Sequence, residues 1–484
     1  TGNYNTALGG FALKNTTASN NTAVGYEAGY SNTTGAQNVF VGTQAGSTNT
    51  TAFNNVAVGF KPFFGSAAVT GGSNAVVGNY ALYVNTTGLN NTGIGQQVLF
   101  GNTTGSYNVA VGSNALQSNT TASYNTAVGY QAGYSNTTGE SNVSLGFKSL
   151  LSATTASNNT ALGESALRAN TTASNNTAVG FSALTANTIG AQNTGIGMYA
   201  LASNTTASDN FAGGYNALGA NTTGSDNVGI GHRALQANTT ASNNTAIGFL
   251  AGQANITGTD NTFVGSEAGD AITTSNANTA LGRLALSAET TSNGNTAIGA
   301  EALRNQNVGG SGDARNTAVG LLAGANVSTG IENTIVGALA GDALTDADYN
   351  VVVGKSALSA DTLGSRSIAI GYKALEAQNF TSATDTYNVA MGHFAGGSVT
   401  TGTNNTLIGG LAGDAITTAS ATTAIGQNAL SSCTTASNNV AVGQDSLFTL
   451  TTGTGNVVLG TAAARGMTTG NYNVVVGQEA LKAN

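Results

Sequence analysis

The stretch Asn21-Thr22-Ala23-Val24-Gly25 decides how the chain folds, because nearly the same five residues return throughout its 484 residues. The glycine that ends each copy, here called the repeat glycine, occurs 28 times and defines 27 intervals. All but four of these intervals have the same length, which is the seventeen-residue step from Gly25 to Gly42. A period this regular indicates one structural unit stacked along a line. It predicts a single continuous repeat domain over residues 1–484. The exceptions are one shorter interval, Gly9 to Gly25, and three longer ones, Gly59 to Gly78, Gly299 to Gly320 and Gly371 to Gly392.

The composition narrows the possible architectures. Hydrophobic residues make up 40% of the chain, but most are Ala and Val, and there is no Trp. Such small side chains can fill only a narrow core. Charged residues make up 7%, against about 25% in ordinary globular domains. No apolar run approaches the ~20 residues of a membrane-spanning helix, so we expect no membrane insertion. The net charge of −8 argues against nucleic acid as a partner.

The residues before the repeat glycine read as a short β-strand. Val24 and Thr22 lie on one face of such a strand, and Ala23 lies on the other. We assign the face of Val24 and Thr22 to the core. The position of Ala23 is never charged in any copy, so the second face is also expected to be covered, as parallel strands usually are. We therefore expect several chains to pack together through the alanine face.

Two positions of the repeat predict a structural role. Asn occupies the fourth position before the repeat glycine in 26 of 28 copies, and stacked coils would place these amides above one another as a hydrogen-bonded ladder. Predicted ladder members include Asn21, Asn38, Asn55, Asn125, Asn176, Asn244 and Asn473. The repeat glycine should turn the corner with a φ that other residues resist. Predicted turn glycines include Gly25, Gly42, Gly129, Gly180, Gly248 and Gly477.

The rest of the unit predicts a second short strand and a turn rich in Asn, Thr, Gly and Ser. Seventeen residues then form one coil with two strands and two turns. The fold class expected is an all-β parallel β-roll or β-solenoid of about 28 rungs. With strands ~4.8 Å apart, 28 rungs would form an elongated rod of roughly 130 Å. One coil holds few inward apolar side chains, which favours oligomerisation.

The motif Asn-Thr-Ala-Val-Gly-Tyr-x-Ala-Leu, with Ser-Asn-Thr-Thr-Gly between copies, resembles the repeats of phage tail fibres and related bacterial surface fibres. It is also similar to the head repeats of YadA-like trimeric autotransporter adhesins. That resemblance implies a left-handed parallel β-roll in which three chains pack around one axis. It covers essentially the whole chain. It also implies a homotrimer located outside the cell or on a virion.

The ends and the long intervals lead to further expectations. No cap, stalk or chaperone domain is apparent in the sequence, and joining Asn484 to another Thr1 would reproduce the spacing between Gly9 and Gly25. Two alternatives stay open: a part of a longer fibre, or subunits that join head to tail. Loop insertions are expected near 60–72, 304–314 and 376–386. The first contains a candidate recognition loop, Lys61, Pro62, Phe63 and Phe64, although neutral insertion is the favoured explanation.

Residues that could carry chemistry are scattered. His232 and His393 lie nine repeats apart, and Cys433 has no local His partner. Asp346-Ala347-Asp348 has the spacing of a calcium loop but lacks the downstream Gly and Glu. We therefore predict no catalytic residues, no metal and no cofactor. Asn-x-Thr/Ser sequons recur, and absence of a glycan is favoured at these positions. They include Asn32, Asn102, Asn119, Asn136, Asn204 and Asn221.

The function expected from these features is that of a non-enzymatic extracellular fibre or filament: a structural rod with an adhesive role. The shaft of a phage tail fibre that attaches to a host is one alternative. An ice-binding solenoid is the other, because Thr recurs in register at the Asn-Thr-Thr turns. An enzyme acting on carbohydrate would need a pair of acid and base groups that the sequence does not offer. The partners expected are other copies of the chain, and a host surface receptor or glycan.

Overall fold

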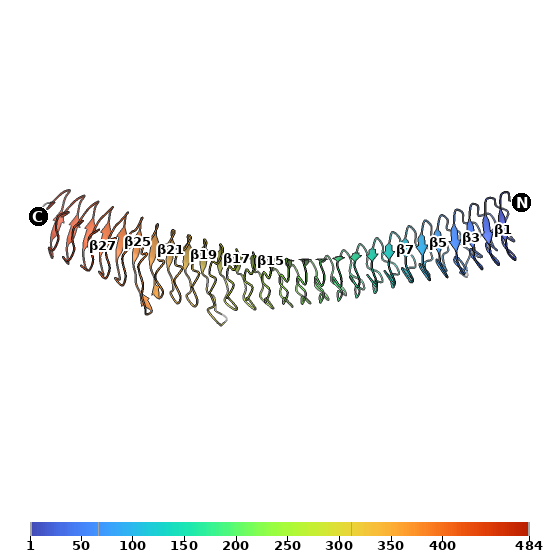
Figure 1. Cartoon of the computed structure of the whole chain (residues 1–484), viewed down its shortest axis with the longest axis horizontal. Coiled ribbons are helices and arrows are strands. Elements are labelled where there is room, and N and C mark those ends of the chain that lie inside the picture. Colours follow the sequence, from blue (N-terminus) through green and yellow to red (C-terminus); the bar gives the residue numbers. More distant parts are fainter. Residues whose placement is uncertain (1, 66, 311, 483–484) are drawn as a thin grey trace. The chain divides into compact units, whose positions relative to one another are not determined.

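The computed structural model describes residues 2–65, 67–310 and 312–482, among which no helix occurs. The predicted fold class is confirmed: the chain forms a parallel β-solenoid whose main sheet has 28 strands, each in register with its equivalent 17 residues further along the chain in most coils. It divides into two compact units, Thr1–Ser242 and Asn243–Asn484. Within each unit every coil contributes one three-residue strand (Figure 1).

The first unit contains strands β1 to β14. They are β1 (Thr6–Leu8), β2 (Thr22–Val24), β3 (Val39–Val41), β4 (Val56–Val58), β5 (Ala75–Val77), β6 (Thr92–Ile94), β7 (Val109–Val111), β8 (Thr126–Val128), β9 (Val143–Leu145), β10 (Thr160–Leu162), β11 (Thr177–Val179), β12 (Thr194–Ile196), β13 (Phe211–Gly213) and β14 (Val228–Ile230). Successive strands pair in parallel with matching repeat positions, as Thr160 opposite Thr177 and Leu162 opposite Val179.

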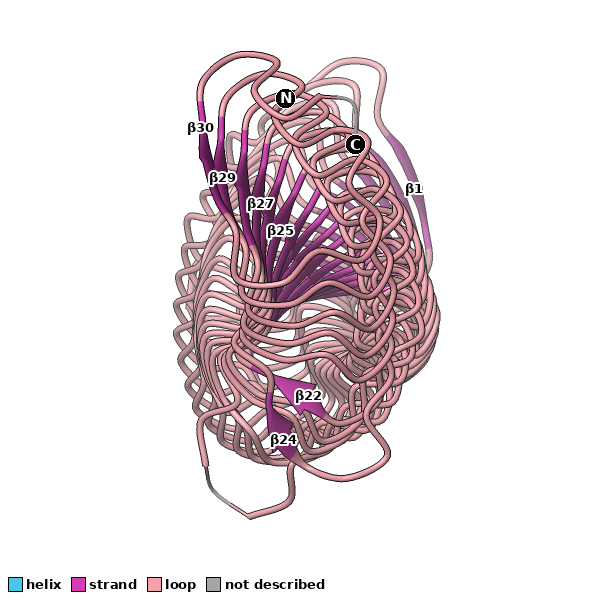
Figure 2. Ribbon diagram, turned by 90° about the vertical axis from the view of Figure 1, so that its left-hand side faces the viewer, coloured by secondary structure: helices cyan, strands magenta, loops and turns pink. Residues whose placement is uncertain are grey.

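The second unit contains strands β15 to β30. They are β15 (Thr245–Ile247), β16 (Thr262–Val264), β17 (Thr279–Leu281), β18 (Thr296–Ile298), β19 (Thr317–Val319), β20 (Thr334–Val336), β21 (Val351–Val353), β22 (Gly364–Ser365), β23 (Ile368–Ile370), β24 (Thr384–Asp385), β25 (Val389–Met391), β26 (Thr406–Ile408), β27 (Thr423–Ile425), β28 (Val440–Val442), β29 (Val457–Leu459) and β30 (Val474–Val476). β22 and β24 pair with each other and form a separate two-stranded sheet. They lie on a different edge of the coil from the other strands (Figure 2).

The strands point their middle residue into the core, so the predicted assignment of faces is wrong. Ala127 is fully buried, and the middle residue is buried in every three-residue strand except β1. The first and third residues point outward, and Val143 and Leu145 are 38% and 48% exposed. The coil is too narrow for large side chains from both walls. Leu from the opposite wall fills most of the space, as Leu167 does. The alanine face is therefore internal and cannot be an interface between chains.

The predicted second strand is absent from the described residues. The second and fourth residues after the repeat glycine have positive φ angles, 54° at Glu27 and 63° at Gly29. This alternation prevents the extended conformation of a strand. Glu27 N donates to Gly10 O at 2.9 Å in the preceding coil, and Gly29 N donates to Ala45 O at 2.9 Å in the next. The segment is therefore held by both neighbouring coils although it is not a strand.

The repeat glycine is required for two reasons. Its φ is +135° at Gly25, and a Cβ built there would lie 2.4 Å from the carbonyl oxygen of Gly42 in the next coil. Both the dihedral angle and the close approach exclude other residues. The other predicted turn glycines share this conformation, with φ of 128° at Gly42, 137° at Gly129, 136° at Gly180, 145° at Gly248 and 124° at Gly477.

Large core residues are matched by glycines at a nearby position of the coil. Phe40 is the middle residue of β3 and is fully buried. The fourth residue after the repeat glycine is commonly Leu, but it is Gly29 in the turn before Phe40 and Gly46 in the turn after it. A Cβ at Gly46 would lie 2.3 Å from the Phe40 ring, and one at Gly29 would lie 2.9 Å from it. Phe263 has the same relation to Gly269, at 2.5 Å. The extra volume of each phenylalanine ring is thus offset by the missing side chains of the neighbouring glycines.

The three predicted insertions differ in structure. Pro62 and Phe63 are buried in an ordinary coil, and the extra residues follow them. Asn49 forms an isolated parallel bridge with Val69 there. In the second insertion Asn293 bridges Asp313. In the third, β22 and β24 form a short parallel pair.

Candidate functional site

The predicted asparagines form a repeating pattern of amide bonds, here called the first Asn ladder, which is interrupted where Ser367 and Thr422 replace Asn. Asn21 Oδ1 accepts from Asn38 N at 3.0 Å and from Asn38 Nδ2 at 3.2 Å. Asn38 Nδ2 also donates to Ala52 O at 2.9 Å. Asn38 Oδ1 then accepts from Asn55 N at 2.9 Å. The same backbone-to-amide bond links Asn125 to Asn108, Asn176 to Asn159, Asn261 to Asn244 and Asn473 to Asn456.

A second Asn ladder lies at the seventh position after the repeat glycine, and the sequence analysis did not identify it. Asn119 Nδ2 donates to Asn102 Oδ1 at 2.7 Å and to Ala122 O at 3.0 Å. Asn136 Nδ2 continues the ladder to Asn119 Oδ1 at 2.9 Å. Asn136 Oδ1 is buried without a partner because the next coil has Ala153 at this position. The regular return of Asn at this position was the available signal.

The second ladder accounts for the recurring sequons. The predicted sequon positions Asn32, Asn102, Asn119, Asn136, Asn204 and Asn221 are all buried, with at most 2% exposure. Asn32 Nδ2 donates to Gly35 O at 2.9 Å, so its amide nitrogen is engaged in the fold. Glycosylation of these side chains would require the folded coils to open.

In the second unit the position of the second ladder is mostly apolar, as at Ile272 and Leu344, and two of its coils carry a buried acid there. Glu289 Oε1 accepts from three successive backbone N–H groups, those of Thr290, Thr291 and Ser292, each at 2.8 Å. Its other oxygen accepts from the Ser292 hydroxyl and from Gln306 Nε2. Asp361 accepts a similar set of hydrogen bonds. Its Oδ1 accepts from Gly364 N and Phe380 N, and its Oδ2 accepts from Gln378 Nε2 at 2.6 Å.

Each buried acid is followed one coil later by a glutamine that joins two positions of the first Asn ladder. Gln306 Nε2 donates to Asn295 Oδ1 at 2.7 Å, and Gln306 Oε1 accepts from Asn316 Nδ2 at 3.1 Å. Asn295 and Asn316 lie on either side of the long interval from Gly299 to Gly320. The glutamine therefore adds a second link across the extended turn, beside the direct bond from Asn316 N to Asn295 Oδ1 at 3.1 Å.

These features belong to a longer period of four coils. The motif Ala-Gly-Asp-Ala recurs with this period at Asp270, Asp342 and Asp414. Glu289 and Asp361 are separated by the same step, and the third equivalent is Cys433. Gln306 and Gln378 correspond to Leu450, and that copy has the ordinary interval between repeat glycines. Within this chain the acid and the glutamine accompany the extended turn, and apolar residues replace them where the turn is short.

The candidate recognition loop is only partly accessible. Phe63 is 1% exposed and occupies the core position that Leu holds in other coils, and Pro62 is also buried. Lys61 Nζ lies 4.6 Å from the ring centroid of Phe64. Phe64 in turn lies 5.9 Å from Tyr83, and Tyr83 stacks on Phe100 at 5.0 Å. The ring faces are occupied by one another and by Lys61, so little aromatic face is left for a ligand.

The first and third residues of the three-residue strands form the most extensive accessible feature, here called the outward strand face. The first residue is Thr or Val in 25 of 28 strands. The third residue is Val, Ile, Leu or Met in every such strand except β13. No charged residue occurs at either position. Within the stack, the exposed fraction is 48% at Ile94 and 44% at Ile196. Continuous apolar exposure on this scale is typical of an interaction surface.

Threonine hydroxyls differ in how far the fold uses them. The first threonine of each turn bonds inside the protein: Thr103 Oγ1 donates to Thr120 O at 3.0 Å. The second, such as Thr104, is exposed. In the described part of the main sheet, strand threonines such as Thr262 and Thr279 are partly exposed on the outward strand face. Accessible hydroxyls therefore lie in two rows, one at the turns and one on the outward strand face.

Ionisable residues are not gathered into a reactive centre in the described parts of the chain, where no group of three His, Cys, Asp or Glu could hold a metal ion. His232 stacks on Tyr215 at 5.2 Å and His393 on Tyr372 at 5.4 Å, far apart in the sequence. Asp348 Oδ1 accepts from Ile331 N at 2.8 Å in the previous coil. Cys433 is buried, and burial raises the pKa of its thiol.

Two aspartates of the four-coil period, Asp270 and Asp342, lie where burial disfavours the ionised form of the carboxyl group. Burial, together with the nearby Glu267, raises the pKa of Asp270 to about 6. Burial also raises the pKa of Asp342. One carboxylate oxygen of each side chain is buried without a hydrogen-bond partner. Each carboxyl group therefore affects how stability depends on pH, and we assign it no catalytic role.

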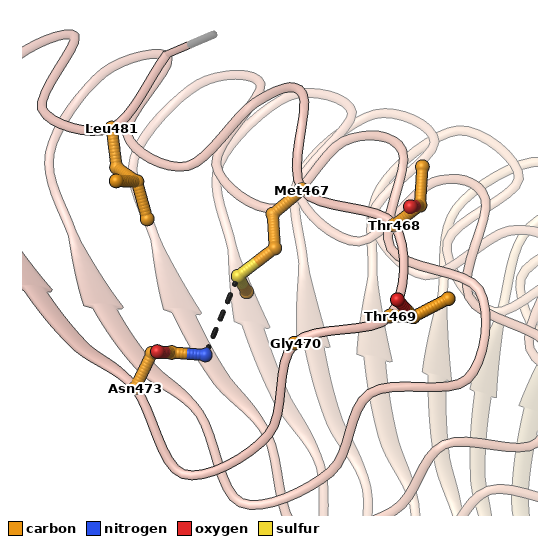
Figure 3. Close-up of a pocket in the computed structure, with 6 residues that line it drawn as sticks. All are labelled: Met467, Thr468, Thr469, Gly470, Asn473 and Leu481. Atoms are coloured by element: carbon orange, nitrogen blue, oxygen red, sulfur yellow. Dashed lines mark hydrogen bonds between the residues drawn. The ribbon is translucent and has the colours of Figure 1, made fainter. Parts of the chain in front are cut away.

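The described residues line small clefts on the surface of the coils. One of about 320 Å³ is shown in Figure 3, where Asn473 Nδ2 points to the sulfur of Met467 at 3.5 Å. Met467 occupies the second-ladder position in that coil, so a thioether replaces the usual amide. The lining combines Thr, Gly, Asn, Met and Leu, which supply no acid, base or nucleophile.

In the described ranges, no helical segment has the length and apolar character needed to cross a bilayer. Neither a protein-family model nor a curated protein sequence matches the chain.

Proposed function

We propose that the protein is a non-enzymatic fibre component that acts outside the cell as a stiff structural rod with an adhesive role. The observation that carries this proposal is the way each coil is joined to its neighbours. Strand, turn and buried amide all bond to the coils on either side, as at Asn38, which contacts residues of both the preceding and the following coil. A stack connected on every side resists bending and local opening.

Self-association is part of this proposal. The resemblance to trimeric adhesin heads implies a left-handed homotrimer, and head-to-tail joining is a second arrangement. A host surface receptor or glycan would be bound through repeated equivalent surfaces, which raise avidity without a strong single site. The shaft of a phage tail fibre would use the same mechanical properties.

The experiment that tests the fibre proposal is resistance to heat and protease combined with electron microscopy of the purified full chain. We expect stiff particles of uniform width, a high unfolding temperature and little cleavage under conditions that degrade globular proteins. Flexible particles that melt at moderate temperature and are cleaved throughout would contradict the proposal.

Ice binding is the second candidate because strand threonines present available hydroxyls in register. Six successive strands, β15 to β20, begin with Thr and end with Val, Ile or Leu. Their spacing of ~4.8 Å would make a regular array of hydroxyl and methyl groups. Thermal hysteresis in dilute solution tests this candidate, and its absence would remove it.

A further inference from the structure

We propose that the outward strand face is the seam against which a second copy of this chain packs, sheet upon sheet. This inference rests on the proposed self-association and deepens it, because it names the surface that joins the chains. That surface is opposite to the alanine face that the sequence pattern had suggested.

The outward strand face is both exposed and aliphatic. In the first unit, the third strand residue is exposed by 48% at Ile94, 48% at Leu145 and 44% at Ile196. These aliphatic side chains have water on one side and the strand backbone on the other. Parallel sheets are normally covered on both faces. Here the inner face is covered by the coil's own Leu and Ala residues, and the outer face is not covered within the described chain.

The available area is sufficient for a stable complex. Fourteen strands of the first unit, ~4.8 Å apart, extend about 62 Å. Two rows of side chains about 7 Å apart occupy a band about 10 Å wide, which gives a footprint of about 600 Å². Standard interfaces bury about 800 Å² on each partner. Counted on both partners, this footprint amounts to about 1,200 Å², which is the lower end of the range of stable interfaces. The second unit presents a separate face of fourteen strands of the same kind.

The spacing identifies a copy of the same chain as the occupant. The third strand residue varies among Val, Ile, Leu and Met, so the face is a series of uneven ridges with one constant period. Another copy carries ridges with the same period and the same lack of charge. Its side chains can interdigitate along the whole length, as in close-packed sheets. Water or ice would leave the bulky aliphatic row unpaired, which disfavours that occupant.

The test compares two triple-lysine variants of the full chain by sedimentation velocity over a concentration series. The seam variant places one lysine on every third coil of the first unit: Ile94→Lys, Leu145→Lys and Ile196→Lys. The control variant places three lysines on other exposed apolar positions of the same unit: Leu89→Lys, Tyr124→Lys and Ile189→Lys. Circular dichroism and thermal melting check that both variants fold.

We expect the unmodified chain and the control to sediment as a multiple of 47.5 kDa and the seam variant to sediment near 47.5 kDa. Facing like charges cost several kcal/mol, so the Kd of the seam variant should rise about 100-fold or more. A monomeric unmodified chain at every concentration would overturn the proposal. So would a monomer with thermal hysteresis, since ice would then occupy the face. Equal dissociation of both variants would also overturn it.

These outcomes are separable from failure of the fibre proposal. A monomer that stays stiff and resists heat and protease overturns the seam alone. An oligomer that dissociates in the seam variant but melts at moderate temperature supports the seam and contradicts the fibre role.

Discussion

Phe40 and its two flanking glycines offer the sharpest test of how the core is packed. Phe40 is fully buried, and replacing a buried Phe by Ala typically costs about 3–5 kcal/mol of the free energy of unfolding, through lost transfer energy and the cavity left behind. The cavity should be hard to close. The neighbouring turns present Gly29 and Gly46 at the facing position, and neither has a side chain to fill the space.

The compensating change follows from the other coils. Where the middle strand residue is Ala, the facing positions commonly carry Leu, as at Leu150 and Leu167. Those leucines have φ of 49° and 50°, close to the 63° and 60° of Gly29 and Gly46. Leu is therefore compatible with the backbone there. We expect the triple variant Phe40→Ala, Gly29→Leu and Gly46→Leu to recover most of the lost stability.

The single change Gly46→Leu should behave in the opposite way. Its Cβ would lie 2.3 Å from the enclosed Phe40 ring, and overpacking of this kind costs about 1–3 kcal/mol or more. The assays are denaturant unfolding and hydrogen exchange at β2, β3 and β4, because stacked coils open locally. A matched control makes the same triple change around the other buried phenylalanine: Phe263→Ala, Gly252→Leu and Gly269→Leu. A triple variant no more stable than Phe40→Ala would refute the volume argument.

Three further changes test the polar core and its charges. Ala153→Asn should raise the free energy of unfolding by about 1 kcal/mol because it gives Asn136 Oδ1 a donor, and an unchanged denaturation midpoint would contradict this. Asp270→Asn should add about 1 kcal/mol at pH 7, an amount reduced for its partial exposure. The pKa of Asp270 is raised to about 6 from 3.8, so the unmodified chain loses stability as pH rises between these values. The two proteins should match below pH 3.8, and a pH-independent difference would exclude the linkage. Glu289→Gln should cost about 2 kcal/mol and speed hydrogen exchange at the amides of residues 290–292, whereas the exposed Glu332→Gln should change neither.

Much of the architecture could be predicted from the period alone. The interval between repeat glycines set the coil length, the parallel register and the first Asn ladder, because stacking brings each residue above its own equivalent. The direction of the strand faces could not be predicted in the same way. An alternating pattern such as Thr22-Ala23-Val24 defines two faces but does not say which one is inside. The alternation favours the larger side chains for the core, but the narrow coil mostly holds small residues such as Ala or Gly opposite its Leu.

The second Asn ladder and the buried acids were missed for a different reason. Asn-Thr-Thr was interpreted as turn chemistry, and a turn is normally expected at the surface. In a closed coil one wall of the turn faces the interior, so Asn119 is buried while the neighbouring turn remains accessible. Glu289 lacked any signal except its place in the four-coil period. The outward strand face follows directly once the direction of the strands is known.

The four-coil period also has a genetic consequence. Because each coil bonds to the coils on both sides, a gain or loss of a few residues inside a strand would break the pairing on two sides at once. Whole coils, or groups of coils, are the units that can be copied without such damage. The equal steps from Asp270 to Asp342 and then to Asp414 indicate that the distal half grew by tandem duplication of a four-coil cassette. The cassette ending near Leu450 differs from the other two because it lacks the acid, the glutamine and the extended turn. In this chain those three features therefore occur together or are absent together.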